Sequence, residues 1–326
     1  MTTRILVTGA NGFLGRALCT TLLVKGFRVI AMVRRAEVTL APGVTPWIAP
    51  ALPELAEDAT RVLADVDVVI HTAGRAHMLQ DQAANPLAEF RRVNTEGTLA
   101  LARAAAAAGV KRFIFVSSIG VNGSDSGSRP MRADDPVRPD SPYAQSKWEA
   151  EQALLELARQ TGMTTLLLRP PMIYGPDAPG NFALLARLVA KGWPLPLGAL
   201  DAPRSFVSVD NVVDLLIHMV NFPDPVSGVY LVADAQITTT TQFIQAIARG
   251  MGRKIPLIPV NSTLLQRLGT LAGRGDQIRK MSVPLAVDIR STTDRLGWTP
   301  PISMDQAMQR AFSASRTSPT SLESNS

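Results

Sequence analysis

Two kinds of hydrophobic pattern alternate along the first 170 residues of the chain. Short continuous runs of Val, Ile, Leu and Phe are typical of strands that are buried on both faces of a parallel sheet. Between them lie longer stretches in which apolar residues recur at helical spacing. Strands are expected within residues 4–8, 27–33, 44–52, 67–74, 112–116 and 164–168, and helices at 16–25, 54–64, 87–108 and 141–161. This alternation predicts an α/β fold with a doubly wound parallel sheet.

The pattern becomes irregular after residue 170, where prolines, helical runs and short strand-like runs are mixed. We expect a main domain over residues 1–170 and a smaller, mixed C-terminal lobe over 171–203 and 236–312. Segments near 204–235 should return to the main sheet, notably 204–209 and 229–232. The tail at 313–326 is rich in Ser and Thr without apolar periodicity, and it is expected to be disordered.

Composition places the chain among ordinary globular proteins, because 46% of its residues are hydrophobic and 18% are charged. No apolar run reaches transmembrane length. The chain starts directly in a strand-like run, without a basic segment followed by an apolar signal core. We therefore expect a cytoplasmic protein with no membrane partner.

The charged residues argue against a nucleic-acid-binding protein, and the few Cys and His residues argue against a metalloprotein. The 33 Lys and Arg against 27 Asp and Glu give a net charge of +6, but they form no long cluster and lack interleaved aromatic residues. No nucleic-acid partner is therefore expected. Cys19 is the single cysteine and the three histidines are scattered, so no metal site is expected.

The first strand-like run ends in a glycine-rich turn that leads into a helix. Gly9 permits a tight turn, Gly12 lets the backbone approach a pyrophosphate, and Gly15 lets the helix pack closely on the strand. An anion would then bind the free N–H groups at the start of the helix. A glycine triplet alone can be an ordinary loop, but its place between strand and helix favours a dinucleotide site of the Rossmann type.

Arg34 and Arg35 follow the second predicted strand, at the position where such a fold meets the adenosine ribose. An acidic residue there would bind the ribose 2′-hydroxyl of NAD, whereas arginine accommodates the 2′-phosphate of NADP. The two arginines favour NADP(H) as cofactor, with NAD as the other possibility. The alternative reading is that both are solvated loop residues.

Tyr143 and Lys147 are four residues apart on a predicted helix, so their side chains project from one face. A free tyrosine has a pKa of about 10, which is too high for a base at neutral pH. A neighbouring ammonium and an oxidised nicotinamide ring are expected to lower that pKa. Lys147 could also hold the nicotinamide ribose, and Ser118 at the end of a neighbouring strand could hydrogen-bond the reacting oxygen. The alternative is an exposed helix start with a snorkelling lysine.

The chain resembles the extended, epimerase/dehydratase-like branch of the short-chain dehydrogenase/reductase superfamily over residues 4–312. The motifs that carry the resemblance are T-G-A-N-G-F-L-G, H-T-A-G, V-N-T-E-G-T, F-V-S-S, S-P-Y-A-Q-S-K, L-R-P-P-M-I-Y-G-P, R-S-F-V-S-V-D and R-L-G-W-T-P. The last two are typical of members that act on nucleotide sugars.

The resemblance implies roles for individual residues. Ser118, Tyr143 and Lys147 take the catalytic positions, with Ser118 also touching the substrate, and Asn94 would order the site or its neighbouring loop. Arg204 would contact the diphosphate of a nucleotide sugar, and Asn181 is a second diphosphate contact. With the glycine turn and the two arginines, the cofactor site consists of Gly9, Gly12, Phe13, Leu14, Gly15, Arg34, Arg35, Ala73, Asn94, Tyr143 and Lys147.

The sequence departs from the family pattern in three places. Ala51 and Leu52 stand where an aspartate followed by an apolar residue often contacts adenine, and Met172 stands where an asparagine often touches the substrate phosphates. UDP-galactose epimerases carry an acidic residue after the second strand, where this chain has the two arginines. These departures bear on the choice of cofactor and substrate.

The shared chemistry implied by the resemblance is hydride transfer between nicotinamide and C4 of a nucleotide-diphosphate sugar. An NADPH-dependent 4-keto-sugar reductase is narrowly favoured by Arg34 and Arg35. A UDP-hexose 4-epimerase with retained NAD is the close alternative, and a non-catalytic dinucleotide sensor is a remote one because Tyr143 and Lys147 are both present. The resemblance also implies a homodimer formed by the helices predicted at 87–108 and 141–161.

Overall fold

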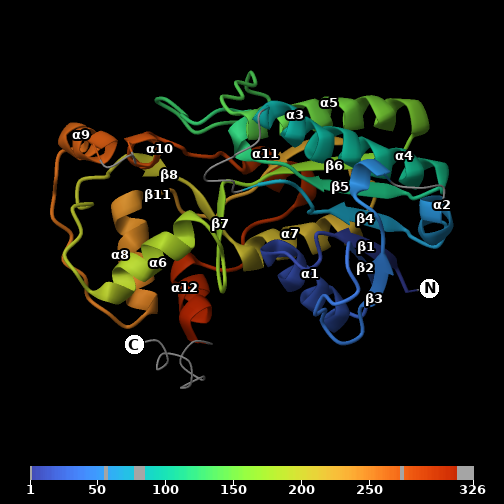
Figure 1. The fold of residues 1–326 in the computed structure, drawn as a ribbon, viewed down its shortest axis with the longest axis horizontal. Coiled ribbons are helices and arrows are strands. Elements are labelled where there is room, and N and C mark those ends of the chain that lie inside the picture. Colours follow the sequence, from blue (N-terminus) through green and yellow to red (C-terminus); the bar gives the residue numbers. More distant parts are fainter. Residues whose placement is uncertain (1, 55–57, 77–84, 272–274, 314–326) are drawn as a thin grey trace.

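The structure is a computed structural model that describes residues 2–54, 58–76, 85–271 and 275–313. Figure 1 shows a sheet-containing main domain and a smaller lobe that extends from one end of it. No helix in these ranges is both long and apolar enough to cross a membrane. Of the tail at 313–326, only Ser313 is described, and it ends the helix α12 (Met304–Ser313).

Seven parallel strands form the central sheet in the order β10-β6-β5-β4-β1-β2-β3. The strand order reverses between β1 and β4, which is where open α/β sheets bind their ligands. The predicted doubly wound fold is therefore confirmed. The strands are β1 Arg4–Thr8, β2 Arg28–Val33, β3 Thr45–Ile48, β4 Val68–His71, β5 Arg112–Val116, β6 Thr164–Arg169 and β10 Gly228–Leu231.

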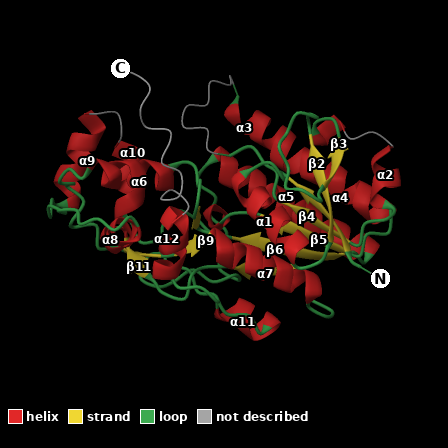
Figure 2. Ribbon diagram, turned by 90° about the horizontal axis from the view of Figure 1, so that it is seen from below, coloured by secondary structure: helices red, strands yellow, loops and turns green. Residues whose placement is uncertain are grey.

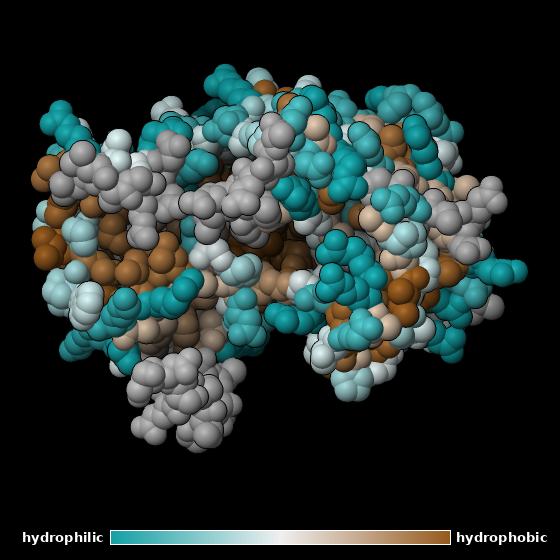
Figure 3. Space-filling view, viewed as in Figure 1, coloured by the Kyte–Doolittle hydropathy of each residue, from teal (hydrophilic) through white to brown (hydrophobic). Residues whose placement is uncertain are grey.

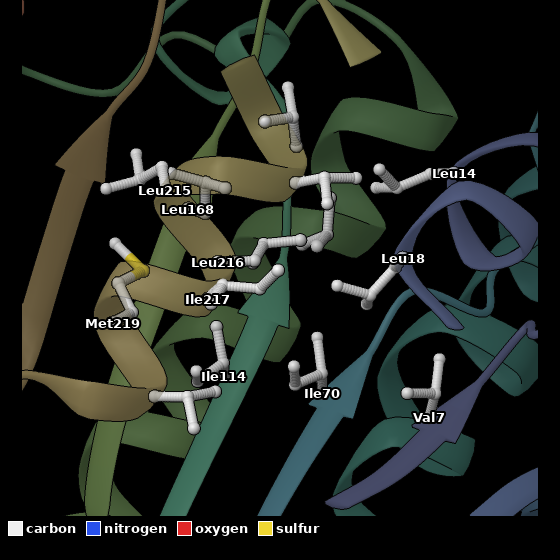
Figure 4. Close-up of a cluster of buried hydrophobic side chains, with 14 of the residues drawn as sticks. Val7, Leu14, Leu18, Ile70, Ile114, Leu168, Leu215, Leu216, Ile217 and Met219 are labelled. Atoms are coloured by element: carbon white, nitrogen blue, oxygen red, sulfur yellow. The ribbon is translucent and has the colours of Figure 1, made fainter. Parts of the chain in front are cut away.

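Helices cover both faces of the sheet because alternate strand residues point to opposite sides. On one face, α1 (Phe13–Val24) and α7 (Val209–Asn221) pack over the strands. Figure 4 shows this cluster, with side chains that include Val7, Leu14, Leu18, Ile70, Ile114 and Leu216. On the other face, α2 (Asp58–Leu63), α4 (Gly97–Ala107) and α5 (Pro142–Thr161) cover Leu6, Val69, Phe113 and Leu167.

The helix predicted at 87–108 is interrupted in the structure. It consists of α3 (Pro86–Phe90), a π-helical turn η2 (Arg91–Glu96) and α4. The helix predicted at 54–64 is reduced to a 3₁₀ turn η1 (Leu52–Glu54) and α2, and residues 55–57 lie outside the described ranges. The π-helical turn is of interest because such turns frequently occur at functional sites.

The smaller lobe contains α6 (Asn181–Lys191), α8 (Thr240–Gly250), α9 (Ser262–Leu271), α10 (Gly275–Ser282) and α12, which Figure 2 shows to one side of the sheet. Its core includes the stacked rings of Phe206 and Phe243, whose centroids are 3.9 Å apart. Two small sheets connect it to the main domain, one of β7 (Met172–Tyr174) and β9 (Phe206–Ser208), the other of β8 (Pro203–Arg204) and β11 (Thr238–Thr239).

Two segments depart from the expected division into lobes. Residues 204–209 were expected in the main sheet, but β8 and β9 pair with β11 and β7 instead, while β10 does join the main sheet. Conversely, α11 (Arg290–Leu296) and Trp298, which fall inside the range expected for the smaller lobe, pack on the main domain. The indole Nε1 of Trp298 donates to Asp214 of α7 at 2.8 Å. Short strands can pair with any exposed partner edge, so the sequence pattern does not specify the partner.

Candidate active site

The candidate site lies at the carboxyl edge of the sheet. The strand register places Thr8, His71 and Phe115 side by side on β1, β4 and β5. The segments that begin with Gly9, Thr72 and Val116 therefore leave the sheet next to one another. Figure 3 shows the molecular surface hollowed between this edge and the smaller lobe.

The glycine turn after β1 is closely packed. Gly9 has a φ of +66°, and a Cβ added there would lie 2.8 Å from the backbone nitrogen of Ala73. A Cβ on Gly15 would lie 2.1 Å from the carbonyl oxygen of Gly9, so the first turn of α1 touches the turn itself. Gly12 is the N-cap of α1 and offers no side-chain cap, which leaves first-turn N–H groups available to an anion.

The side chains of Phe13 and Leu14 differ in burial and in the residues they pack against. Leu14 is buried in the core beneath α1, so only its backbone can reach a ligand. Phe13 is half-buried and packs against both the main core and that of the smaller lobe. It therefore bridges the two lobes beside the turn.

Arg34 and Arg35 follow β2 at the same edge, and both are exposed. Neither makes a hydrogen bond or an ion pair with any residue that the structure describes. Since β2 pairs directly with β1, these two guanidinium groups lie one strand away from the glycine turn.

Asn94 lies in the π-helical turn and is 1% exposed. Its side-chain oxygen accepts from the backbone N–H of Arg75 at 2.7 Å, and its Nδ2 donates to the Arg75 carbonyl and to Ser146 Oγ, each at 3.1 Å. A Cβ on Gly74 would lie 3.2 Å from the Asn94 oxygen and 3.3 Å from Lys147 Nζ. Asn94 thus fixes the loop after β4 against α5, next to the lysine.

Ser118 and Tyr143 are both half-buried, and the Ser118 side chain acts to lower the pKa of Tyr143. Ser118 Oγ accepts the N–H of Gly120 at 3.1 Å, which holds its rotamer. Burial nevertheless raises the pKa of Tyr143 to about 12, because the influence of Ser118 only partly opposes the desolvation. The expected lowering of this pKa by a neighbouring ammonium is therefore wrong for the protein alone, because desolvation of the phenolate dominates.

Lys147 is 3% exposed, and its Nζ donates to the carbonyl of Val116 at 2.9 Å and lies 4.4 Å from the centroid of the Phe115 ring. Burial lowers its pKa to about 8, while the carboxylate of Glu151 partly opposes that shift. The alternative of an exposed, snorkelling lysine is excluded by this burial. Lys147 stands on the buried face of α5 together with Ser146.

The two substrate-side residues lie in a different part of the molecule. Asn181 is the exposed first residue of α6. Arg204 is half-buried in β8, and its Nη1 donates to the carbonyls of Lys280 at 2.6 Å and Val283 at 2.7 Å. Burial lowers the pKa of Arg204 to about 10. Among the described residues, neither side chain hydrogen-bonds to Ser118, Tyr143 or Lys147.

Sequence reasoning missed the polar residues that support this edge. His71 is fully buried, lies 2.6 Å from Thr8 Oγ1 and 2.9 Å from Thr98 Oγ1, and burial lowers its pKa to about 3. Arg169 at the end of β6 forms a buried ion pair with Glu151 of α5. The sequence did contain a signal for His71 and Arg169. Each of them is the polar residue that directly follows a run of apolar strand residues.

Comparison with known proteins identifies the family. The model of the NAD dependent epimerase/dehydratase family matches residues 5–233. The chain belongs to this family. It is thus an enzyme of the extended short-chain dehydrogenase/reductase type, as the motifs predicted.

Individual members of the family differ in reaction. The chain is 36% identical over 312 residues to a UDP-glucose 4-epimerase of Vibrio cholerae, covering 95% of this chain and 94% of the relative. It is 26% identical over 331 residues to a GDP-6-deoxy-D-mannose reductase of Pseudomonas aeruginosa, covering 96% and 97%. The fold matches the crystal structure of a Thermotoga maritima UDP-glucose 4-epimerase with UDP-glucose, with a TM-score of 0.77, 22% identity, and coverage of 96% of this chain and 99% of the other.

The residues at the carboxyl edge fit the nicotinamide dinucleotide that the family name implies. Gly9 and Gly15 leave no room for side chains, the start of α1 carries no side-chain cap, and Gly74 lets the loop after β4 pass close to Lys147. Close backbone, uncapped N–H groups and a buried ammonium are the features that such a cofactor's pyrophosphate and ribose require. The family membership alone does not distinguish NAD from NADP.

Proposed function

We propose that this enzyme is an NADPH-dependent reductase of the 4-keto group of a nucleotide-diphosphate sugar. The observation that carries the proposal is the pair Arg34 and Arg35, which are exposed and unpaired among the described residues at the carboxyl end of β2. Guanidinium groups bind a 2′-phosphate in a bidentate manner, whereas NAD is favoured by an acidic residue there. A cofactor that is bound as NADPH serves one reduction and then leaves.

The protonation state of Tyr143 supports the reductive direction. With its pKa raised to about 12, the phenol is protonated at neutral pH and can act as a general acid. When bound, the nicotinamide supplies the hydride. Tyr143 then delivers its proton to the former carbonyl oxygen of the sugar, and Ser118, whose side chain lowers the pKa of Tyr143, favours the phenolate that remains.

Lys147 positions the site and supplies positive charge. Its Nζ uses one of three N–H donors on the Val116 carbonyl, which leaves donors for a ribose hydroxyl. Because it is anchored at the end of β5, next to Ser117 and Ser118, the ammonium is held in place before any ligand binds. Such preorganisation lowers the cost of orienting the reactants.

Arg204 is the proposed contact for the substrate diphosphate. Its Nη1 is held by the two carbonyls near the end of α10, while its Nε and Nη2 make no hydrogen bond with the described residues. The lowered pKa of this buried guanidinium indicates that an anion beside it would relieve a desolvation cost. Asn181, at the start of α6, is the proposed second contact.

The second candidate is a 4-epimerase that retains NAD, and the Vibrio cholerae relative is named a UDP-glucose 4-epimerase. The relative covers nearly the whole chain at 36% identity, which favours a shared sugar-nucleotide substrate. An epimerase needs Tyr143 as a base in its first half-reaction, and the raised pKa opposes that role in the protein alone.

One experiment distinguishes the two candidates. Purified enzyme is denatured, any released cofactor is identified by mass spectrometry, and binding of NADPH and NADH is measured by titration calorimetry. The reductase predicts an empty protein that prefers NADPH, and replacing Arg34 and Arg35 with serine should weaken NADPH binding at least about tenfold with little effect on NADH. Stoichiometric NAD in the purified protein would establish the epimerase instead.

Turnover provides the second test of the proposal. Tyr143→Phe should lower kcat by about 10²–10⁴ with little change in KM, since the hydroxyl acts in the proton-transfer step. Binding of NADPH to this variant serves as the control for folding. Unchanged turnover would refute an enzymatic role for Tyr143, and with it the mechanism above.

A further inference from the structure

One surface of the smaller lobe combines exposed apolar side chains with cations. We call it the basic apolar surface and define it by Lys191, Trp193, Arg253, Lys254 and Ile258. Two segments build it side by side: Leu195 donates to the carbonyl of Pro256 at 3.0 Å, and Ile258 donates to the carbonyl of Leu195 at 2.8 Å. In Figure 1 these segments run along the outer left margin, next to α9.

The apolar side chains of this surface are unusually open to water. Trp193 is 67% exposed and Ile258 is 49% exposed, and Leu264 of the adjacent α9 is 52% exposed. Figure 3 shows hydrophobic residues reaching this outer margin of the lobe. The Nζ of Lys191 lies 5.3 Å from the centroid of the Trp193 ring, so cation and aromatic ring are presented together.

The positive excess of the whole chain falls in the two stretches of sequence that contribute this surface. Residues 178–200 and 235–275 contain no Asp or Glu, although the chain has 27 of them. The same two stretches contain seven of the 33 basic residues, so the rest of the chain has 26 basic and 27 acidic residues. The seven are Arg187, Lys191, Arg249, Arg253, Lys254, Arg267 and Arg274. Of these, Arg249 is paired with Asp305 of α12.

We infer that the basic apolar surface docks the enzyme peripherally on an anionic lipid bilayer. Tryptophan is enriched at membrane interfaces, where its ring lies at the level of the headgroups. Lys and Arg beside it are attracted to anionic lipids, and aliphatic side chains such as Ile258 enter the acyl boundary. No described helix could span the bilayer, so the contact is confined to the surface.

The charge and the apolar side chains of this surface favour a lipid bilayer over two other partners, a second copy of the chain and a nucleic acid. A second copy of the chain would bring two surfaces of the same sign together, which is unfavourable. A nucleic acid would match the charge but would leave the aliphatic side chains Ile258 and Leu264 without an apolar partner. The inference revises the expectation of no membrane partner, which rested on the absence of a spanning segment. It does not depend on the reaction proposed above.

The test is co-sedimentation of the full chain with vesicles of phosphatidylcholine, with and without phosphatidylglycerol. Binding is expected only to the vesicles that contain phosphatidylglycerol, and it should weaken as salt is added. Tryptophan emission should shift to the blue on binding, and Trp193→Phe should remove that shift. Equal binding to both vesicles, or no binding to either, would overturn the inference.

Matched variants locate the contact. Lys191→Gln with Lys254→Gln should weaken binding to the anionic vesicles by roughly fivefold per cation removed. The control pair Lys25→Gln with Arg28→Gln makes the same charge change on exposed residues of the main domain and should leave binding unchanged. Equal losses in both pairs would show attraction to net charge alone and would contradict a defined surface.

The apolar part of the contact has its own pair of variants. Trp193→Ser should reduce vesicle binding, whereas Val24→Ser, at an 81% exposed position of α1, should not. Melting temperatures of all variants check that they fold. Sedimentation without lipid completes the test: if Trp193→Ser dissociates an oligomer and does not alter vesicle binding, the surface joins copies of the chain and the lipid assignment is wrong.

Discussion

Replacing Lys147 with methionine should stabilise the folded protein at neutral pH while abolishing its function. The lysine is 3% exposed, and burial lowers its pKa from 10.5 to about 8. At about pH 7 the folded protein must therefore hold a buried ammonium at a cost of about 3 kcal/mol, since one pKa unit corresponds to about 1.4 kcal/mol. Methionine has a similar length and can occupy the same space against the Phe115 ring.

The gain is reduced by the contacts that methionine lacks. The hydrogen bond from Nζ to the Val116 carbonyl contributes about 1 kcal/mol net, and the cation above Phe115 adds about 0.5 kcal/mol or more. The variant should therefore be more stable by about 1–2 kcal/mol at neutral pH.

The stability difference between Lys147→Met and the wild type should change with pH in a direction that the lowered pKa of Lys147 fixes. Below pH 8 Lys147 is protonated in both the folded and the unfolded state, so the cost is present in full. Between about 8 and 10.5 the folded state releases its proton first, the unfolded state binds more protons, and the wild type gains stability as pH rises. The advantage of Lys147→Met should therefore be largest near pH 7 and vanish by about pH 10.

The assay is urea unfolding of the cofactor-free protein at a series of pH values, read as the difference between wild type and variant. The difference cancels other titrating groups, such as Cys19, whose pKa is raised to about 12 by burial. Lys111→Met, at a side chain that is 83% exposed, is the matched control and should show little change. A variant that is less stable than the wild type at neutral pH, with no dependence of the difference on pH, would refute the reasoning.

Three further outcomes follow from the structure. Gly15→Ala should weaken dinucleotide binding, measured by calorimetry, more than tenfold, or by about 1.4 kcal/mol. The reason is that the added Cβ would lie 2.1 Å from the Gly9 carbonyl oxygen. Unchanged affinity would contradict the close packing of the turn. Glu151→Gln should lower the free energy of unfolding by about 3–5 kcal/mol, because it removes the carboxylate that pairs with buried Arg169. The control is Glu149→Gln, which removes a carboxylate of α5 from an exposed ion pair and should cost less than about 1 kcal/mol. Ser118→Ala should reduce kcat at least about tenfold in single-turnover assays with unchanged cofactor affinity, and a pure KM effect would reassign it to substrate binding.

The motifs of the candidate site could be recognised in the sequence because each one is a short-range pattern. Gly9, Gly12 and Gly15 lie within one turn, and Tyr143 and Lys147 lie within one helix turn. The continuous apolar runs likewise predicted the strands of the parallel sheet, since burial on both faces demands them. These features can be predicted without knowing which residues far away in the sequence they contact.

The environment of those same residues could not be read in this way. The pKa of Tyr143 rises because the fold desolvates it, although its neighbours in the sequence suggested a fall. Arg204 is held by Lys280 and Val283, which are more than 70 residues away, and Asn94 reaches Arg75 only through a π-helical turn. No local pattern contains this information.

The sequence by itself thus determined the parallel sheet and the glycine turn and put Tyr143 and Lys147 on one helix face, because each of these features depends on residues within a few positions of one another. Only the tertiary structure decided that 204–209 leaves the main sheet, that Lys147 is buried on the Val116 carbonyl, and that the segment of Lys191 and Trp193 lies beside that of Ile258. Burial, charge and strand partnership depend on which distant segments come together, and packing of the whole chain sets that.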